Sequence, residues 1–294
     1  MALPQLPPRR PDSHKGDYGR ALLIGGSRGM AGAISLAGMA TLRSGAGLVT
    51  IATADACQPV VAGFEPSYMT IGLASDAEGR LAKMAHRPLV EAAARSTAIG
   101  CGPGLGRSHE LVKLVERLYF ELQHPTVFDA DGLNALAQQP DILTRPGGPR
   151  ILTPHPGEFG RLVAKDGPMS DGERRERAID LAIRCNVVVV LKGHQTFITD
   201  GHRSEVNTTG NPGMATGGTG DVLTGVLVAL LCQGLDPFQA AHLGAYIHGL
   251  AGDLAAAELG QGSMIARDLL NFLPAAFKLT GGTPIDESCS EAFQ

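Results

Sequence analysis

Residues 207–225 read NTTGNPGMATGGTGDVLTG, and the apolar run that begins at Val222 continues beyond them to Leu235. Glycines at positions 217, 218 and 220 permit a backbone turn in which several N–H groups point the same way. A helix expected to begin near Gly220 adds its free N-terminal amides and the positive end of its dipole. The segment therefore predicts an anion site at a helix start, suited to a phosphoryl group in transfer.

Asp221 stands at the start of this predicted helix, beside the anion site. A carboxylate in that position can accept a proton from an attacking hydroxyl. Aspartate is also common at helix starts as a capping residue, so the residues alone leave both roles open. The spacing from Gly213 to Thr219 approaches that of a Walker A loop, but the lysine that such a loop uses on the phosphates is missing. The anion site is therefore not expected to be a P-loop.

Short apolar runs alternate with helical patterns along most of the chain, and several runs are apolar throughout. Such runs are typical of strands that are covered on both faces. The predicted strands are Ala21–Ile24, Leu48–Ala52, Ala98–Cys101, Thr126–Phe128, Ile151–Thr153, Val187–Leu191 and Thr196–Thr199. The predicted helices are Ala31–Ser44, His109–Gln123, Gly132–Gln138, Asp171–Cys185, Gly220–Gln233 and Pro237–Glu258. The alternation predicts an α/β fold with a mostly parallel sheet and helices on both faces.

The length of 294 residues suits one large α/β domain or two ordinary ones. No break in the pattern indicates a second domain. We expect an N-terminal arm over residues 1–15, a single catalytic domain over 16–280 and a polar C-terminal tail over 281–294.

Composition excludes several classes of partner. The net charge of -4, with no Lys/Arg run longer than Arg9-Arg10, argues against nucleic acid. The N-terminus lacks the apolar core of a signal peptide, and Val222–Leu235 is too short to span a bilayer. Five scattered cysteines without a C-x-x-C pair indicate a reducing compartment with thiols used as small apolar residues. We expect a cytoplasmic protein that binds no membrane.

Two further glycine clusters follow predicted strands. The first is GGSRGMAGA over residues 25–33, and the second is GCGPGLG over residues 100–106. Neither has the G-x-G-x-x-G spacing of a dinucleotide-binding Rossmann turn. Because the carboxyl ends of parallel strands meet at one edge of a sheet, we expect both loops to lie there, where open α/β folds bind ligands.

Three polar residues are expected at the same edge. His155 lies between two prolines that fix its backbone direction, so it is either a ligand contact or a solvated turn histidine. Glu158 either reaches a metal ion through water or starts the next helix. Lys192 directly follows a buried strand and precedes a glycine, so it either meets nucleotide phosphates or is a surface lysine in a hairpin turn.

Two other groups of polar residues could suggest metal sites. His242 and His248 are six residues apart, which is not a metal-ligand spacing on a helix, so both are interpreted as core or interface residues. Asp129 and Asp131 flank a strand end, and they resemble a helix-start turn as much as a metal site.

Taken together, these segments resemble the NAD(P)H-hydrate dehydratase family, a branch of the ribokinase-like fold. Any one of the motifs is weak, but their order across roughly residues 15–280 is highly specific. They are KGDYG (15–19), GGSRGMAGA (25–33), SGAGLVT (44–50), CGPGLG (101–106), DADGLNAL (129–136), TPHPGE (153–158), LKGHQT (191–196) and NTTGNPGMATGGTGDVLTG (207–225).

The resemblance implies a ribokinase-like three-layer α/β/α fold and a repair reaction, in which water added to the nicotinamide ring of NADH or NADPH is removed with ADP or ATP and Mg²⁺. Asp221 would be the base, and the amides of Gly218, Thr219 and Gly220 would stabilise the transferred group. The repair substrate would also meet three further residues, Ala33, Gly104 and His155. The nucleotide would meet Gly220 and the segment Lys192, Gly193, His194, Gln195 and Thr196.

The resemblance also implies a homo-oligomer, with a homotetramer as the expected form. It further implies a functional link to a separate epimerase, since many members carry a fused epimerase domain. Vitamin kinases of the superfamily often show N-x-x-E before the nucleotide site, whereas this chain has His155 and Glu158. That difference favours a dehydratase. The alternatives are a thiazole or pyrimidine alcohol kinase of the same fold, which would leave a stable phosphorylated product, and a non-catalytic nucleotide sensor, which would not need Asp221.

Overall fold

The apolar runs pair side by side into one nine-stranded sheet with the order β3-β2-β1-β4-β5-β6-β7-β8-β9. The computed structural model describes residues 1–165 and 167–281. The strands are β1 (Arg20–Ile24), β2 (Leu48–Ala54), β3 (Met69–Leu73), β4 (Ala98–Cys101), β5 (Thr126–Phe128), β6 (Arg150–Leu152), β7 (Val188–Leu191), β8 (Phe197–Thr199) and β9 (Ser204–Val206).

The sheet is parallel from β3 through β7, and β8 and β9 extend it as antiparallel strands. The prediction of a mostly parallel sheet is therefore confirmed. Every residue of β4 and β7 is buried, which explains why these strands are apolar throughout. The sequence pattern missed β3 and β9, because both are short and partly exposed and carry no continuous apolar run.

Helices connect the strands. The α-helices are α1 (Ala31–Arg43), α2 (Gln58–Ala62), α3 (His86–Ala93), α4 (His109–Glu121), α5 (Ala130–Leu136), α6 (Pro156–Leu162), α7 (Asp171–Cys185), α8 (Thr219–Cys232), α9 (Pro237–Leu259) and α10 (Ala266–Thr280). Short 3₁₀ helices are η1 (Lys15–Tyr18), η2 (Lys83–Ala85), η3 (Pro140–Thr144) and η4 (Pro212–Met214). The six helices predicted from the pattern are all present, while α2, α3, α6 and α10 were missed.

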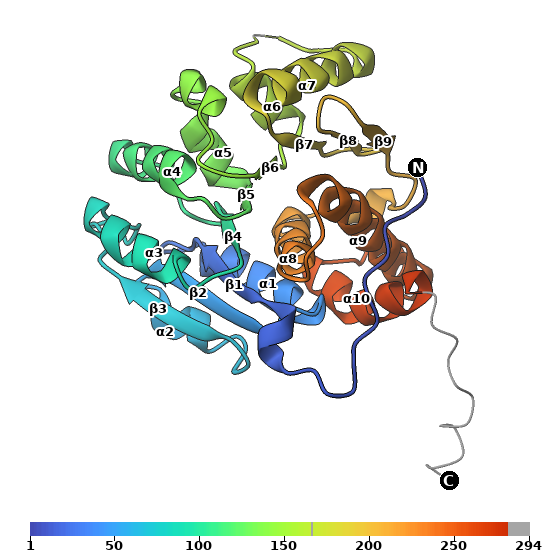
Figure 1. The fold of residues 1–294 in the computed structure, drawn as a ribbon, viewed down its shortest axis with the longest axis horizontal. Coiled ribbons are helices and arrows are strands. Elements are labelled where there is room, and N and C mark those ends of the chain that lie inside the picture. Colours follow the sequence, from blue (N-terminus) through green and yellow to red (C-terminus); the bar gives the residue numbers. More distant parts are fainter. Residues whose placement is uncertain (166, 282–294) are drawn as a thin grey trace.

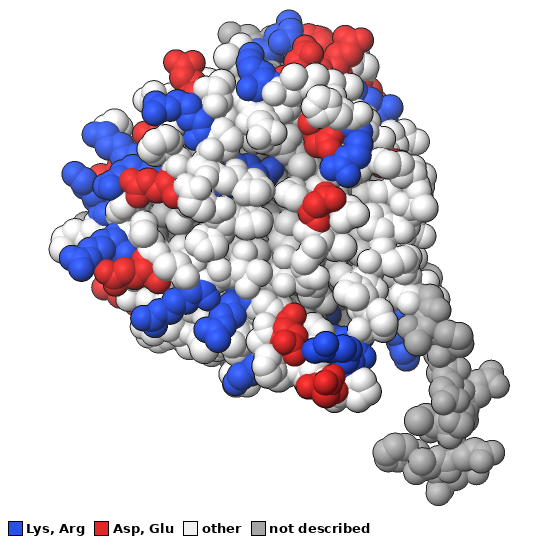
Figure 2. Space-filling view, in the orientation of Figure 1, with Lys and Arg blue, Asp and Glu red and all other residues white. Residues whose placement is uncertain are grey.

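The helices form a layer on each face of the sheet (Figure 1). One layer consists of α1, α8, α9 and α10, which pack against one another, and the other runs from α3 through α7. The three-layer α/β/α architecture predicted from the resemblance is therefore confirmed. Lys and Arg side chains are interspersed with Asp and Glu around the face shown in Figure 2, as expected for a chain of net charge -4.

The direction of strand order reverses between β1 and β4, because the chain builds β2 and β3 on one side of β1 and then β4 to β9 on the other. Ligands bind at such a switch point in open α/β folds. The two glycine-rich loops meet there, since Gly26 N–H donates to Pro103 O at 2.9 Å and Ser27 Oγ donates to Gly104 O at 2.8 Å. The expected meeting of these loops at one sheet edge is confirmed.

Helix α8 is the centre of its layer. Every residue from Val222 to Cys232 is buried, which matches a helix that is apolar on all sides. It approaches α1 so closely that a Cβ on Gly225 would lie 2.2 Å from the Ala37 carbonyl oxygen. Thr41 Oγ1 also donates to the Gly225 carbonyl at 3.1 Å. Helix α1 therefore fixes the position of α8 and of the residues at its N-terminus.

The other sequence predictions concern the N-terminal arm, the C-terminal tail, the cysteines and membrane-spanning segments. The arm, residues 1–14, has no helix or strand, although Leu3 and Leu6 pack against the core. The predicted tail lies, beyond Gly281, outside the described residues, as does Cys289. The cysteines in the described ranges are free and buried, and burial raises the pKa of Cys101 and Cys232 to about 12. No helix within residues 1–165 and 167–281 is long and apolar enough to cross a membrane.

We predict that Gly225→Ala destabilises the protein by about 2 to 3 kcal/mol, because overpacking forces α1 and α8 apart. This loss opposes the gain of about 1 kcal/mol that alanine brings to a helix interior. Urea unfolding measures the difference. The control is Gly262→Ala, where a Cβ would meet no atom within 4 Å and the change should stay within about 0.5 kcal/mol. A Gly225→Ala protein as stable as the wild type would refute the close packing.

Candidate active site

The N-terminus of α8 presents free backbone amides. Gly218 precedes the helix with φ of 97°, a left-handed conformation that suits glycine. Among the described residues, none accepts a hydrogen bond from the backbone N–H of Gly218, Thr219, Gly220 or Asp221. The helix begins at Thr219, one residue before its expected start, so these amides and the helix dipole point at one place. The arrangement is that of an anion site.

Asp221 lies in the first turn of α8, and in the described part of the chain its carboxylate has no hydrogen-bond or ion-pair partner. Desolvation raises its pKa to about 7, and the negative charge of Asp129 adds to this effect against the opposing charge of Lys192. A capping aspartate would accept a hydrogen bond from the helix start, and Asp221 does not. An unpaired carboxyl group with a pKa near neutrality suits a general base.

Asp129 is the buried acceptor at the middle of the site. It follows β5 and is 1% exposed. Its Oδ1 accepts from Thr153 Oγ1 at 2.7 Å and from Lys192 Nζ at 2.6 Å, while its Oδ2 accepts from Thr224 Oγ1 at 3.0 Å. The sequence left Asp129 open between a helix-start turn and a metal site, and neither interpretation included this role as a buried acceptor. The available signal was an aspartate directly after a short strand with two large apolar residues, Val127 and Phe128, a position that buries a carboxylate.

Lys192 begins the turn between β7 and β8, yet it is not a surface lysine. Its Nζ lies 2.6 Å from Asp129 Oδ1 and 3.9 Å from Glu158 Oε2. Burial lowers its pKa, but the charges of Asp129, Glu158 and Asp221 outweigh burial and leave the pKa raised. A Cβ on Gly220 would lie 3.3 Å from this Nζ, so the ammonium group stands beside the start of α8.

His155 and Glu158 form the capping box of α6. His155 Nδ1 accepts from the backbone N–H of Gly157 at 3.0 Å, and Glu158 Oε2 accepts from the backbone N–H of His155 at 2.9 Å. Desolvation and the nearby Lys192 lower the pKa of His155, so its ring is neutral. Desolvation raises the pKa of Glu158. Glu158 thus starts a helix, one of its two predicted roles, and its buried carboxyl also faces Lys192.

Ala33 and Gly104 lie together at the switch point between β1 and β4. A Cβ on Gly104 would lie 3.2 Å from the Ala33 Cβ and 2.5 Å from the Met30 carbonyl oxygen, and Gly104 has φ of 64°. Only glycine leaves room at this position. No hydrogen bond or ion pair in the described ranges joins this pair to Asp221.

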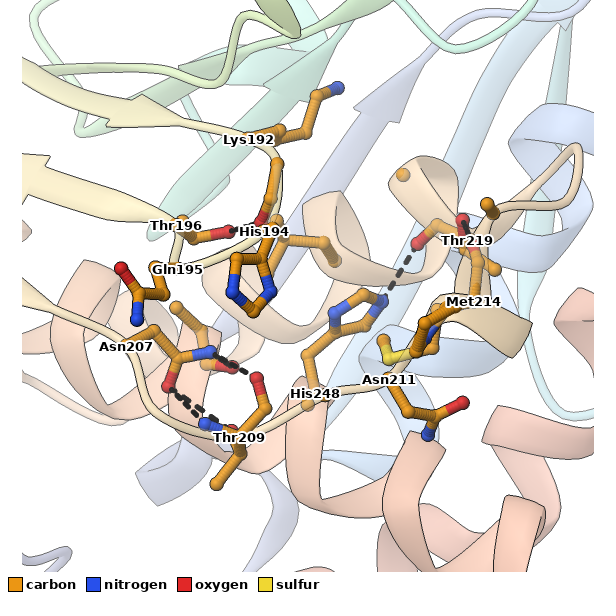
Figure 3. Close-up of a pocket in the computed structure, with 18 residues that line it drawn as sticks. Lys192, His194, Gln195, Thr196, Asn207, Thr209, Asn211, Met214, Thr219 and His248 are labelled. Atoms are coloured by element: carbon orange, nitrogen blue, oxygen red, sulfur yellow. Dashed lines mark hydrogen bonds between the residues drawn. The ribbon is translucent and has the colours of Figure 1, made fainter. Parts of the chain in front are cut away.

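A cavity of about 470 Å³ opens beside the first turn of α8 (Figure 3). Its walls are the turn after β7, the loop 207–215, the first turn of α8 and one face of α9. They include all six residues predicted to meet a nucleotide: Lys192, Gly193, His194, Gln195, Thr196 and Gly220. Figure 3 shows the Lys192 side chain running away from the His194 and His248 rings.

The loop 207–215 is tied to α9 by its own polar residues. Thr209 Oγ1 donates to the Tyr246 carbonyl at 2.8 Å, and Asp253 accepts from the Gly210 N–H at 2.8 Å and from Asn211 Nδ2 at 3.0 Å. The close approach requires a small residue in α9, since a Cβ on Gly249 would lie 2.2 Å from Thr209 Oγ1. The glycines of α9 therefore pack within the domain and hold one wall of the cavity.

His248 connects α9 to the anion site. Its Nε2 lies 2.9 Å from the Thr219 carbonyl oxygen (Figure 3). Desolvation lowers its pKa to about 4, so the ring is neutral and Nε2–H is the donor. The interpretation of His248 as a core residue was therefore incomplete, because the same ring lines the cavity. The six-residue spacing between His242 and His248 gave no indication that the His248 ring lines a cavity.

The chain matches the family model described as NAD(P)H-hydrate dehydratase over residues 21–275. It is 48% identical to a bifunctional NAD(P)H-hydrate repair enzyme of Moorella thermoacetica, over 92% of this chain and 51% of that protein. The chain spans about half the length of this and similar curated relatives. It is also 36% identical to an ADP-dependent (S)-NAD(P)H-hydrate dehydratase of Bacillus subtilis, over 93% of this chain and 94% of that one.

Solved structures with a similar fold include a member of the same family. The fold superposes with a TM-score of 0.77 on an ADP/ATP-dependent NAD(P)H-hydrate dehydratase from Bacillus subtilis that was co-crystallised with ATP and Mg²⁺, at 35% identity and with 94% of this chain and 95% of that chain covered. A hydroxyethylthiazole kinase from Pyrococcus horikoshii gives a TM-score of 0.59 at 17% identity, over 90% of this chain and 92% of that one. The second likeness shows the shared fold alone.

The raised pKa of Asp221 predicts an effect on stability. A carboxyl group whose pKa is about 7 in the folded protein and 3.8 otherwise stabilises the fold fully only below pH 3.8, and this contribution is lost as pH rises through 7. We therefore expect Asp221→Asn to raise the melting temperature, and to raise it more at about pH 8 than at about pH 5. The control is Asp180→Asn on the exposed side of α7, which should change neither. An equal shift at both pH values would contradict the assignment.

Proposed function

Because the chain belongs to the NAD(P)H-hydrate dehydratase family, we propose that it removes water from hydrated NADH or NADPH and consumes a nucleotide in doing so. The S epimer of the hydrate would be the substrate, and the reaction would restore the reduced nicotinamide. The enzyme is then a carbon–oxygen lyase that repairs nicotinamide nucleotides.

One observation carries the proposal. A carboxyl group with a pKa near 7 and no partner among the described residues, Asp221, stands at the free N-terminus of α8, where Gly220 and Lys192 line a cavity of nucleotide size. A base, an anion hole and a donor pocket are the parts that phosphoryl transfer to a hydroxyl group requires. A non-catalytic nucleotide sensor has no use for the base.

Asp221 accepts the proton of the ring hydroxyl in the first step, and the hydroxyl oxygen attacks the terminal phosphoryl group of the nucleotide. The bond from that phosphorus to the bridging oxygen breaks, which releases AMP from ADP or ADP from ATP. The backbone N–H groups of Gly218, Thr219 and Gly220 stabilise the charge of the phosphoryl group in transit. Lys192, beside Gly220, contributes positive charge at the same point.

The phosphorylated ring then loses phosphate, because the lone pair of the ring nitrogen forms a double bond to the carbon that bears the leaving group. Loss of a proton from the adjacent ring carbon restores the dihydronicotinamide. Phosphate is a good leaving group, so this step needs no strong acid. The neutral ring of His155 is therefore sufficient for a binding role.

The residues divide between the two substrates. Ala33, Gly104, His155 and Asp221 would contact the hydrated nicotinamide, and the absence of a side chain on Gly104 provides the space for it. The segment from Lys192 to Thr196, together with Gly220, would contact ADP or ATP in the cavity that it lines.

The carboxylates fit an Mg²⁺ ion that arrives with the nucleotide. Asp129, Glu158 and Asp221 face the single ammonium group of Lys192, so a polyphosphate would enter a site that already has excess negative charge. In the described residues, no group of three His, Cys, Asp or Glu could hold a metal by itself. Glu158 would therefore act through water, in line with the preference of Mg²⁺ to keep several waters. Bound Mg²⁺ would neutralise phosphate charge.

We also propose a linked enzyme activity, a cellular location and an oligomeric state for the enzyme. Relatives of about twice this length are named bifunctional, which supports a link to a second repair activity, an epimerase by family resemblance. A cytoplasmic homo-oligomer, a tetramer by the same resemblance, fits the buried reduced thiols and the family.

The direct test is to incubate the protein with hydrated NADH, Mg²⁺ and either ADP or ATP. We expect absorbance at the reduced-nicotinamide band to return, with one phosphate released per ring restored. Failure with both nucleotides would refute the proposal. A stable phosphorylated product in place of restored NADH would identify a kinase of the same fold.

Asp221→Asn should lower kcat by on the order of a hundredfold or more, because an amide cannot accept the proton. Binding of the nucleotide, followed by calorimetry, should persist. An unchanged kcat would show that the carboxylate has only a structural role.

The wild-type rate should depend on pH. Since Asp221 must be deprotonated to act and has a pKa of about 7, kcat/KM should rise with pH and level off above that value. A profile that is flat from about pH 5.5 to 8 would exclude Asp221 as the base.

A further inference from the structure

A second cavity, of about 440 Å³, is separate from the nucleotide cavity. It is bounded by the end of the glycine-rich loop after β4, the first turn of α4, one face of α5 and Arg161 of α6. None of its lining residues belongs to the nucleotide cavity, and none has a role in the steps above.

The cavity is positively charged. Arg161 has no carboxylate within ion-pairing distance in the described residues, and its only hydrogen bond is from Nε to Asn134 Oδ1 at 3.0 Å. Arg107 is mostly exposed and only loosely paired, with Nε 3.4 Å from Asp131 Oδ1. Asp131 is already occupied, since its Oδ2 accepts from the Gly106 N–H at 2.9 Å. Two guanidinium groups therefore face one carboxylate that is engaged elsewhere.

The first turn of α4 adds to this charge. Ser108 caps the helix by accepting from the Leu111 N–H at 3.1 Å, while the N–H groups of His109 and Glu110 have no acceptor in the described residues. The helix has 13 residues, so its dipole also favours an anion at this end. Guanidinium forks and free helix amides together form a site suited to phosphate.

The cavity adjoins the dehydration centre. Gly106 in its wall is two residues beyond Gly104, where the hydrated ring is proposed to bind. The Asp131 charge is close enough to Asp221 to help raise its pKa, and the Arg161 charge similarly lowers the pKa of His155. A ligand that reaches from Gly104 past Gly106 would enter this cavity.

We propose that this cavity binds the phosphate-bearing adenosine half of the hydrated dinucleotide, with Arg107 and Arg161 as the residues that recognise its phosphates. This inference rests on the proposed function. The nicotinamide half would lie at Asp221, and the pyrophosphate and adenosine ribose would extend along Gly104 and Gly106. The 2′-phosphate of the NADPH form carries roughly -1.5 to -2 charges at neutral pH, so the arginines should favour that form.

The first test compares Michaelis constants. In the double variant Arg107→Ala/Arg161→Ala, the KM for hydrated NADPH should rise about tenfold or more, since each charged hydrogen bond contributes on the order of a tenfold factor. The KM for hydrated NADH should rise less, and kcat and the KM for ADP should stay within about twofold. Arg117→Ala is the control. Arg117 lies on α4, whose first turn borders the cavity, but it pairs with Glu121 and does not line the cavity. An unchanged KM for both hydrates would overturn the proposal.

The second test does not depend on turnover. With a non-hydrolysable ATP analogue filling the nucleotide cavity, 2′-phospho-ADP-ribose should bind the wild type in calorimetry and bind the double variant at least about tenfold more weakly. Binding without any dehydratase activity would support this site and refute only the proposed reaction. If the protein is active but wild type and variant bind 2′-phospho-ADP-ribose equally, this site alone is refuted. Binding of inorganic phosphate without binding of 2′-phospho-ADP-ribose would also refute this site.

Discussion

The buried carboxylate of Asp129 is the constraint on which the rest of the site depends. It accepts from Thr153, Lys192 and Thr224, which come from the ends of β6 and β7 and from α8. A carboxylate that is 1% exposed is costly unless its oxygens are hydrogen-bonded and a positive charge lies nearby. These three contacts meet that requirement, and in doing so they fix the start of α8 relative to the sheet. The anion site therefore has a rigid position.

The same burial sets the chemistry of Asp221. Lys192 lies 2.6 Å from Asp129, so Asp221 receives only part of the stabilisation that the ammonium group offers, while Asp129 repels its negative form. Desolvation is the larger effect, and together they bring the pKa of Asp221 close to neutrality. A carboxyl group held at that pKa is less favourable for folding than an ordinary surface aspartate. The fold tolerates it at the position where a hydroxyl proton would have to be accepted.

Much of the framework was predictable because local signals were strong. Apolar runs such as Ala98–Cys101 sit in the middle of the sheet and carry no competing pattern, and the glycines before Asp221 marked a helix start to within one residue. Residues 69–73 and 204–206 were missed, because edge strands are short and half-exposed. The contacts of Asp129 and His248 were not predicted, since their partners are 24 to 95 and 29 residues away in the sequence. Such partners leave no local periodicity.

The sequence by itself determined the α/β class, the mostly parallel sheet, the ordered family motifs and the glycine-rich start of α8, because each depends on neighbours within a few turns or on motifs that are contiguous. The tertiary structure decided which charges meet. It brought Lys192 to Asp129 and not to solvent, and it set Arg107 and Arg161 around one cavity. Among the residues that the structure describes, it left Asp221 without a hydrogen-bond or ion-pair partner. The physical reason is that burial and Coulomb interactions depend on distance in space, and the sheet edge gathers residues that the chain keeps far apart.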